Sequence, residues 1–353
     1  CLTACPTQAL RVHRGGPLVL AHLCIECTAC VAACPTGALG LEAAAALPPP
    51  AARALVLPPA VLAQFGSAIP PAGVVAALRA LGFGEVRTTG AWERAQAEAT
   101  AAAASSAPLL AALCPAVVSL VETRFPSLLE ALAPYLTPLE AAAVDAPADA
   151  LIVCVCPAQR SALVALGLAP ERLLAPQALR DALLAELHAP PPAGAAPLAA
   201  PVPAPAPAAT AGLPVHGLAA VRRTLEELED GQLTFGGALE LWACPYGCFG
   251  SGLLPAANPA VAAARWRDDA AAAPAPRRRA VPYSARPGLR LDPDMAAAVA
   301  KLRRIDELTR ALPGRDCGQC GAPTCRALAE DVVLERAPAS ACAHQAAAAE
   351  RSA

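Results

Sequence analysis

The spacing of the cysteine residues constrains this chain more than any other feature of its sequence. Fifteen cysteines occur in 353 residues, and they fall in tight groups separated by long stretches without cysteine. Disulfide frameworks of this density belong to small secreted proteins, whereas this chain is long enough for two or three domains. The grouping and the chain length therefore favour metal ligation over disulfide formation.

The first group of cysteines, within residues 1–34, contains an internal repeat. One copy places cysteines two, two and three residues apart and ends with a proline: Cys24, Cys27, Cys30 and Cys34. Cys1 and Cys5 repeat the end of that pattern, again with a proline after the last cysteine. The tetrapeptides Thr-Gln-Ala-Leu and Thr-Gly-Ala-Leu follow the two prolines, which indicates a duplicated unit.

The repeated pattern resembles that of two-cluster bacterial ferredoxins, in which three cysteines hold one [4Fe–4S] cluster and the fourth ligates the other. The resemblance implies that one cluster is held by Cys5, Cys24, Cys27 and Cys30. It implies that a second uses Cys1 and Cys34, with two further ligands before residue 1. Zinc is the alternative for a single Cys-x2-Cys pair, but the third cysteine and the Cys-Pro end favour clusters. We therefore expect residues 1–45 to relay electrons.

A second complete set of cysteines lies near the C-terminus. The segment Cys317-Gly-Gln-Cys320-Gly-Ala-Pro-Thr-Cys325 places three thiols on a glycine-rich turn, and Cys342 follows a predicted helix over residues 326–335. This arrangement resembles the [4Fe–4S] domain with the pattern Cys-Gly-x-Cys-Gly-x-Pro-x-Cys, found in corrinoid iron–sulfur proteins and electron-transport subunits. The resemblance implies that these four cysteines hold a further cluster, with zinc as the alternative.

Residues 52–255 have the pattern of an α/β domain. Short apolar runs at residues 54–57 and 150–155 are typical of buried strands, and they alternate with helical patterns at 74–81 and 117–132. The scattered arginines and the net charge of −2 indicate no face for nucleic acid. With 56% hydrophobic residues, the chain can bury a sizeable core.

Proline and alanine mark the boundaries of this domain. Residues 189–214 repeat Pro-Ala, so we predict an extended, solvated insertion there, and we predict a linker over residues 256–294. Residues 295–353 begin with a predicted helix that ends before Pro-Gly. The predicted architecture is thus a central α/β domain flanked by a ferredoxin-type α+β module and a small, mostly helical [4Fe–4S] domain.

The central domain has five cysteines of its own: Cys114, Cys154, Cys156, Cys244 and Cys248. The order of Leu113-Cys114-Pro115, Cys156-Pro-Ala-Gln-Arg160 and Glu240-x3-Cys244-x2-Gly247-Cys248 resembles the hydrogenase-like C-terminal domain that [FeFe]-hydrogenases carry in their large chain. The resemblance implies that Cys114, Cys156, Cys244 and Cys248 hold the [4Fe–4S] part of the H-cluster, beside which a diiron subsite is possible. Cys154 is predicted to be a core residue, because free cysteine is often buried.

Three positions differ from the catalytic members of that family. Leu113 stands where the family has a proton-shuttling cysteine, and leucine has no proton to transfer. Gln159 replaces a lysine that contacts a cyanide ligand of the diiron centre, with Arg160 as a candidate substitute, and Tyr246 replaces a glycine. These substitutions predict slow hydrogen turnover. With its ferredoxin-type module and its C-terminal cluster site, the chain resembles sensory or regulatory hydrogenase-like proteins more than the prototypical enzymes. His216 and His344 could ligate metal, but packed or solvated histidines are commoner.

Three hypotheses of function follow. The first is a hydrogenase-like redox sensor or slow enzyme, and the second is an electron carrier or scaffold protein that binds only cubane clusters. The third, ranked last, is an interaction protein with structural clusters. Under the first two we expect redox partner proteins, a ferredoxin or a signalling protein. With no membrane-spanning run and no signal peptide in the sequence, we expect a soluble, cytoplasmic protein.

Overall fold

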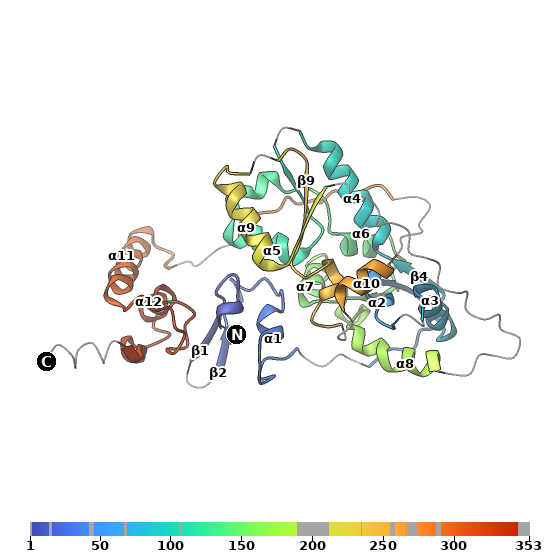
Figure 1. Cartoon of the computed structure of the whole chain (residues 1–353), viewed down its shortest axis with the longest axis horizontal. Coiled ribbons are helices and arrows are strands. Elements are labelled where there is room, and N and C mark those ends of the chain that lie inside the picture. The colour runs from blue at the N-terminus through green and yellow to red at the C-terminus, as the bar shows by residue number, and fades with distance from the viewer. Residues whose placement is uncertain are drawn as a thin grey trace, which may run out of the picture. The chain divides into compact units, whose positions relative to one another are not determined.

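The computed structural model describes residues 2–13, 16–41, 46–66, 69–105, 107–188, 212–233, 235–254, 258–266, 274–286 and 291–344. Cys1 and most of the predicted insertion, residues 189–211, lie outside these ranges. The chain divides into two compact units (Figure 1). The central unit contains Glu26–Thr28 and Leu41–Ser284, and the cluster unit contains Cys1–Ile25, Ala29–Gly40 and Ala285–Ala353. The segments near the two ends of the chain thus belong to one unit.

The central unit contains two parallel sheets. The first has the strand order β4-β3-β6-β7 and comprises β3 (Ala54–Leu57), β4 (Glu85–Thr88), β6 (Leu151–Val153) and β7 (Leu173–Leu174). The second has the order β5-β9-β8 and comprises β5 (Leu109–Ala111), β8 (Leu213–His216) and β9 (Ala238–Trp242). In the first sheet Leu55 pairs with both Val86 and Leu151. Parallel strands require crossover connections, and helices supply them here.

Most helices of the central unit begin with a proline, whose fixed φ and missing N–H suit the first helical position. These are α2 (Pro59–Leu62), α3 (Pro71–Ala80), α5 (Pro115–Arg124), α6 (Pro138–Val144), α7 (Pro157–Ala165), α8 (Pro176–His188) and α10 (Pro259–Arg265). The others are α4 (Gly90–Ala103) and α9 (Leu218–Glu229). Short 3-10 helices occur at η2 (Pro126–Ala131), η3 (Pro170–Arg172) and η4 (Gly247–Gly250). Many prolines of this chain thus start helices instead of breaking them.

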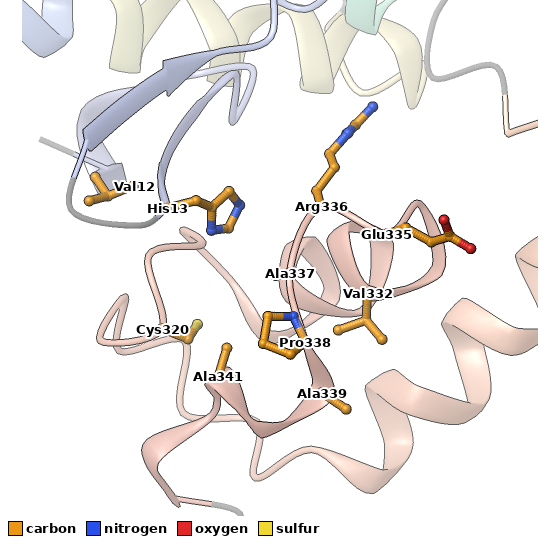
Figure 2. Close-up of a pocket in the computed structure, with 10 residues that line it drawn as sticks. All are labelled: Val12, His13, Cys320, Val332, Glu335, Arg336, Ala337, Pro338, Ala339 and Ala341. Carbon is orange, nitrogen blue, oxygen red and sulfur yellow. The ribbon is translucent and has the colours of Figure 1, made fainter.

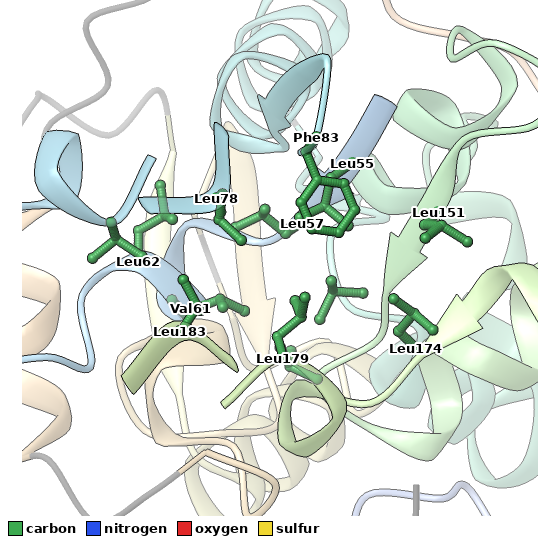
Figure 3. Close-up of a cluster of buried hydrophobic side chains, with 14 of the residues drawn as sticks. Leu55, Leu57, Val61, Leu62, Leu78, Phe83, Leu151, Leu174, Leu179 and Leu183 are labelled. Atoms are coloured by element: carbon green, nitrogen blue, oxygen red, sulfur yellow. The ribbon is translucent and has the colours of Figure 1, made fainter. Parts of the chain in front are cut away.

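The two inner strands of the first sheet, β3 and β6, are buried on both faces, as expected for parallel strands. Leu55, Leu57 and Leu151 contribute to a cluster on one face, together with Leu78 and Phe83 (Figure 3). Their neighbours along the same strands, Val56 and Ile152, are also fully buried but belong to a different cluster. Burial of each such side chain contributes about 1.5–3 kcal/mol to stability. These apolar layers hold the end of β6, which leads to Cys156.

Three predicted segments differ from the structure. The helix predicted over residues 117–132 ends at Arg124, because the residue before Pro126 is disfavoured in helical conformation, and η2 follows. Leu213 and Pro214, predicted to end a solvated insertion, lie in β8. The predicted linker, residues 256–294, contains α10.

The described stretch 274–286 of that predicted linker also differs from a free connection. Arg277 accepts a backbone hydrogen bond from Leu136 of 2.8 Å and forms an ion pair with Asp145. Arg279 forms an ion pair with Glu140 at 3.2 Å, and the Tyr283 hydroxyl donates to the Tyr135 carbonyl at 2.7 Å. Ion pairs with distant residues, which the amino-acid composition does not indicate, hold this segment against the rest of the central unit.

The cluster unit combines a β-hairpin with short helices. The hairpin pairs β1 (Leu10–His13) with β2 (Gly16–Val19) in antiparallel register. The helical elements are η1 (Leu2–Ala4), α1 (Ala29–Ala32), α11 (Met295–Ala311), α12 (Cys325–Val333) and η5 (Ala339–Ala341). Among all described helices of both units, none is long and apolar enough to span a bilayer.

Candidate iron–sulfur sites

The central cysteines follow the carboxyl ends of three parallel strands. Cys114 comes three residues after β5, Cys156 three residues after β6, and Cys244 two residues after β9. Cys248 lies in η4, which is in the same loop as Cys244. Ligands of α/β proteins bind at the carboxyl ends of parallel strands, because loops from several strands converge there. The topology therefore brings together cysteines that are far apart in the sequence.

All four cysteines line one cavity of the central unit. Its other lining residues are Cys27, Pro115, Ala116, Val155, Gln159, Trp242, Ala243, Gly247 and Ser251. The lining contains no aspartate, glutamate, lysine or arginine among the described residues, so its polar side-chain groups are the thiols, one amide, one hydroxyl and the indole of Trp242. Cys27, which we predicted only as a ferredoxin-type ligand, was not anticipated in this cavity.

The central thiols titrate far from their ordinary range because they are buried. Burial raises the pKa of Cys114, and it raises the pKa of Cys156 and of Cys248 well above the ordinary value. Burial followed by the nearby thiol of Cys114 raises the pKa of Cys244 to about 12. Thiolates gathered in such a dry site need positive charge from a bound metal centre. An iron–sulfur cluster, with iron bound directly to sulfur, fits this donor set.

Cys114 and Cys156 occupy equivalent local positions. Each is the N-cap of a helix, α5 or α7, and each is followed by the proline that starts the helix. The first backbone N–H groups of a helix have no partner within it, and they favour negative charge nearby. Each Cys-Pro step thus places a thiol where a helix N-terminus stabilises its thiolate.

Glycine is required at one point of the Cys244–Cys248 loop. A Cβ atom on Gly250 would lie 2.4 Å from the carbonyl oxygen of Pro245, which is closer than real contacts allow. Tyr246 has the left-handed φ of 56° that favours glycine, although it is a tyrosine. Its ring stacks on His216 with centroids 6.0 Å apart, which offsets part of the backbone strain.

The substituted positions of the family pattern differ in their surroundings. Gln159 faces the cavity: its Oε1 accepts from the Val155 N–H at 2.8 Å, and its Nε2 donates to Cys248 Sγ at 3.6 Å. Arg160 is exposed and donates to the Leu173 carbonyl at 3.0 Å, so our suggestion that it substitutes for the family lysine is wrong. Leu113 is buried, 4% exposed. Among these positions Gln159 supplies the donor to the cavity.

The C-terminal cysteines line a second cavity, within the cluster unit. Cys317, Cys320, Cys325 and Cys342 all contribute to it, together with His344. Cys325 is the first residue of α12, and its N–H donates to Asp316 at 2.6 Å. Cys317 is exposed, whereas Cys342 is buried. This site lies on a loop near the surface, so solvent reaches part of its ligand set.

The two copies of the ferredoxin-type repeat form similar turns. Gln8 and Gly37 occupy the same place in the two copies, and both have left-handed φ values, 56° and 67°. Cys5 Sγ accepts from the Ala9 N–H at 3.2 Å. Hydrogen bonds from the backbone of Leu39 and from the Thr36 hydroxyl lower the pKa of Cys34 to about 7. Amide hydrogen bonds to sulfur of this kind tune cluster potentials.

Two residues that we considered at the sequence level are now located. Cys154 is 4% exposed and packs in the cluster with Val56 and Ile152, which confirms it as a core residue. His216 lies on β8, and burial lowers its pKa. It stacks on Tyr246 and is absent from the cysteine cavity lining.

Zinc was the alternative at each cysteine group, and it differs from a cluster in the geometry that it requires. A zinc ion draws four sulfur atoms to about 2.3 Å from one point. A cubane cluster binds four separate thiolates through its four iron atoms, so its ligands are spread around a wider space. In the described ranges, no three histidine, cysteine, aspartate or glutamate side chains meet closely enough to hold a single metal ion. Counting of zinc and iron in one purified sample therefore separates the two.

Three segments of the chain match models of protein families. Residues 53–146 match "Iron only hydrogenase large subunit, C-terminal domain", and residues 18–40 match "4Fe-4S binding domain". Residues 312–344 match a family described as "Putative Fe-S cluster". The last two matches contain Cys24, Cys27, Cys30 and Cys34, and all four C-terminal cysteines, respectively. Cys114 is the one central cysteine of the candidate set inside the first match.

Solved structures similar to this chain are [FeFe]-hydrogenases. A variant of HydA1 from Chlamydomonas reinhardtii is 17% identical, with 62% of this chain and 83% of that chain covered and a TM-score of 0.44. A second variant of the same protein is 16% identical, with coverage of 62% and 84% and a TM-score of 0.42. No curated protein matches the chain significantly.

These matches define the class of the protein: it is an iron–sulfur protein with features of electron transfer. Over residues 53–146 it resembles the C-terminal domain of the large chain of iron-only hydrogenases, and it also carries a 4Fe-4S binding domain and a further iron–sulfur segment.

Proposed function

We propose that this chain is a multi-cluster electron-transfer protein of the sensory or regulatory hydrogenase-like type, with little or no rapid hydrogen turnover. The proposal rests chiefly on one observation: Cys114, Cys156, Cys244 and Cys248 converge on one cavity at the ends of parallel strands. A [4Fe–4S] cluster on these cysteines would supply the redox chemistry of the cavity. Two clusters in the ferredoxin-type module and one on the C-terminal cysteines complete the proposed set.

Slow turnover follows from the residues beside the cavity. Leu113 precedes the first cavity cysteine and offers no group that accepts or releases a proton. Gln159 presents a neutral amide where the resembling family has a cation. A diiron subsite, if the cavity takes one, would therefore meet weaker proton delivery and weaker anion binding than in the catalytic family.

A second candidate function is that of an electron carrier or scaffold protein that binds cubane clusters alone. The occupied amide of Gln159 favours it, because that side chain already bonds Val155 and Cys248 across the cavity. In both cases we propose a redox partner protein, a ferredoxin or a signalling protein, as the donor or acceptor.

The two candidates differ in the diiron subsite, which infrared spectroscopy detects directly. The protein would be purified without oxygen after co-expression with hydrogenase maturation enzymes, and its iron and sulfide counted. We expect bands of iron-bound carbonyl and cyanide, in a region where few protein groups absorb. Cubane iron without such bands would leave the carrier function, and absence of both would contradict every form of the proposal.

A substitution then tests why turnover is slow. Leu113→Cys restores a proton-carrying side chain at the family position, so hydrogen production with an artificial electron donor should rise at least roughly tenfold. Ala112→Cys is the matched control, since Ala112 is equally buried and lies one residue away. Equal rates in the two variants would show that the missing thiol does not limit turnover.

A further inference from the structure

Within the cluster unit, the hairpin and the C-terminal segment are joined by a contact that no sequence motif indicates. Arg11 of β1 and Asp331 of α12 are 320 positions apart and form an ion pair with Nε and Oδ2 separated by 2.6 Å. Both side chains are almost completely excluded from solvent, at 1% and 0% exposure. Charged groups are rarely buried so fully, because the loss of hydration must be offset by close partners.

Arg11 also reaches the turn that follows a cluster ligand. Its Nη1 donates to the carbonyl oxygens of Gln8 and Leu10, and Gln8 is the left-handed residue of the turn after Cys5. On the other side, the Asp331 carboxylate is 3.1 Å from His13 Nε2 and 3.5 Å from Arg336 Nη1. One buried carboxylate is thus shared by the hairpin and by the segment after α12.

A backbone contact accompanies the ion pair. The Val12 N–H donates to the Gly321 carbonyl at 2.7 Å, and Gly321 follows Cys320 directly. A Cβ atom on Gly321 would lie 1.8 Å from the Val12 carbonyl oxygen, so only glycine permits this approach. Gly318, in the same loop, would meet nothing closer than Leu2 Cδ1 at 3.5 Å. The close approach is specific to the glycine beside Cys320.

These contacts form a continuous path between two candidate ligands. From Cys320 the path passes through the Gly321 carbonyl to the Val12 N–H and along β1 to Ala9. The Ala9 N–H donates to Cys5 Sγ at 3.2 Å. Beside this path lies a cavity of about 750 Å³, with Val12 and His13 on one side and Cys320 and Ala337 among the facing residues (Figure 2).

We propose that Asp331, Arg11 and Gly321 are positioning residues that clamp the C-terminal cysteine loop onto β1, so that the C-terminal cluster exchanges electrons directly with the cluster on Cys5. This inference rests on the proposed function, because it takes both cysteine sets as cluster ligands. The exchange moves one electron and makes or breaks no bond. The C-terminal site then serves as a station of the relay.

The first test compares two aspartates of the same unit in the full, cluster-loaded chain. Asp331→Asn keeps the size of the side chain but leaves Arg11 without its full charge partner. Asp306→Asn is the matched control, because Asp306 pairs with Arg326 at 2.8 Å with both side chains about half exposed. Buried pairs respond strongly to loss of one partner and exposed pairs weakly.

Two measurements report on the clamp. In Asp331→Asn, hydrogen exchange at the Val12 amide should accelerate roughly tenfold or more, with no such change in Asp306→Asn. In the fully reduced protein, the electron paramagnetic resonance signal broadened by interaction between neighbouring clusters should narrow in Asp331→Asn. Asp331→Glu should recover both properties in part. Identical behaviour of Asp331→Asn and Asp306→Asn would overturn the inference.

A glycine pair covers the case in which Asp331→Asn does not fold. Gly321 and Gly318 both have left-handed φ values, 84° and 74°, so alanine strains the backbone similarly at either position. Only Gly321→Ala collides with Val12, and only it should weaken the magnetic interaction; equal effects of the two substitutions would contradict the clamp.

Iron counting distinguishes failure of the proposed function from failure of the clamp. Missing C-terminal iron in the unmodified chain sinks the proposed function, whereas full iron with unchanged coupling in the variants sinks the clamp alone.

Discussion

The central and the C-terminal cysteine cavities each contain a complete set of four cysteines, but they are built from very different amounts of protein. The central cavity lies at the ends of β5, β6 and β9; β6 is buried between two apolar clusters, and β9 is buried along its whole length. The C-terminal cavity adjoins a core of five buried residues: Ala322, Ala327, Leu328, Ala337 and Cys342. Three of the five are alanines, which bury little apolar area each.

The difference in core size indicates that the two cavities depend to different degrees on a bound cluster for their structure. The central unit has enough apolar core to hold its cavity open around protonated thiols. The C-terminal segment has a far smaller core, and small scaffolds of this kind depend on metal for folding. We therefore expect that a cluster in the central cavity would add little to the stability of its unit, whereas a cluster on the C-terminal cysteines would be needed for that segment to fold.

The largest expected difference between the two cavities is their response to removal of iron. Treatment of the protein with a chelator and a reductant should remove amide protection from residues 312–344, because the apolar core of that segment is small. Strands β3 and β6 should keep their protection, since their side chains are buried on both faces. Hydrogen exchange with mass spectrometry measures both regions in one sample. Equal loss in the two regions would show that the central cavity also needs its cluster to fold.

Serine substitutions at two neighbouring cysteines test which of them binds a cluster and which packs in the core. Cys156→Ser should cost the protein about four iron atoms, one cubane, with the central unit still folded. Cys154→Ser is the matched control: it should retain all iron but lose about 1–3 kcal/mol of stability, because a buried hydroxyl replaces a packed thiol. Iron counting and urea unfolding test both variants. Iron loss from Cys154→Ser would contradict its place in the core.

The pH dependence of the stability of the iron-free protein tests whether water reaches the thiols of the central cavity. The pKa of Cys244 is raised to about 12, so the folded state holds this proton more tightly than the unfolded chain, where the pKa is about 8.5. Its stabilising contribution is complete below pH about 8.5 and is lost as the pH rises toward about 12. Urea midpoints should therefore fall between pH about 8.5 and about 10. Cys244→Ser should show a shallower decline, and an unchanged slope would mean that water reaches this thiol.

The smallest expected effect concerns backbone strain beside the central cavity. Tyr246→Gly removes the cost of a left-handed tyrosine, about 1–2 kcal/mol, but it also removes the stacking on His216, about 0.5–1.5 kcal/mol. We expect a net change between a loss of about 0.5 kcal/mol and a gain of about 1.5 kcal/mol in thermal unfolding experiments. Tyr246→Ala loses the ring and keeps the strain, so it should be less stable than either. If Tyr246→Ala equals Tyr246→Gly, the strain is negligible.

Local features of this protein were readable from its sequence. The strand at residues 54–57 has the predicted bounds, because its apolar pattern is sufficient to specify it. The cysteine spacing also identified segments that match iron–sulfur families, since ligands of one cluster lie close together in such motifs.

Long-range features were decided by the tertiary structure alone. No spacing rule indicates that Cys27 lines the cavity of Cys114 and Cys244, or that Arg11 is buried against Asp331. Arg160 follows Gln159 directly and nevertheless lies outside the cavity, because successive helical residues diverge by about 100°. Periodicity and spacing report the contacts within one element. The ends of parallel strands, and a charge pair 320 positions apart, meet only when the whole chain has packed.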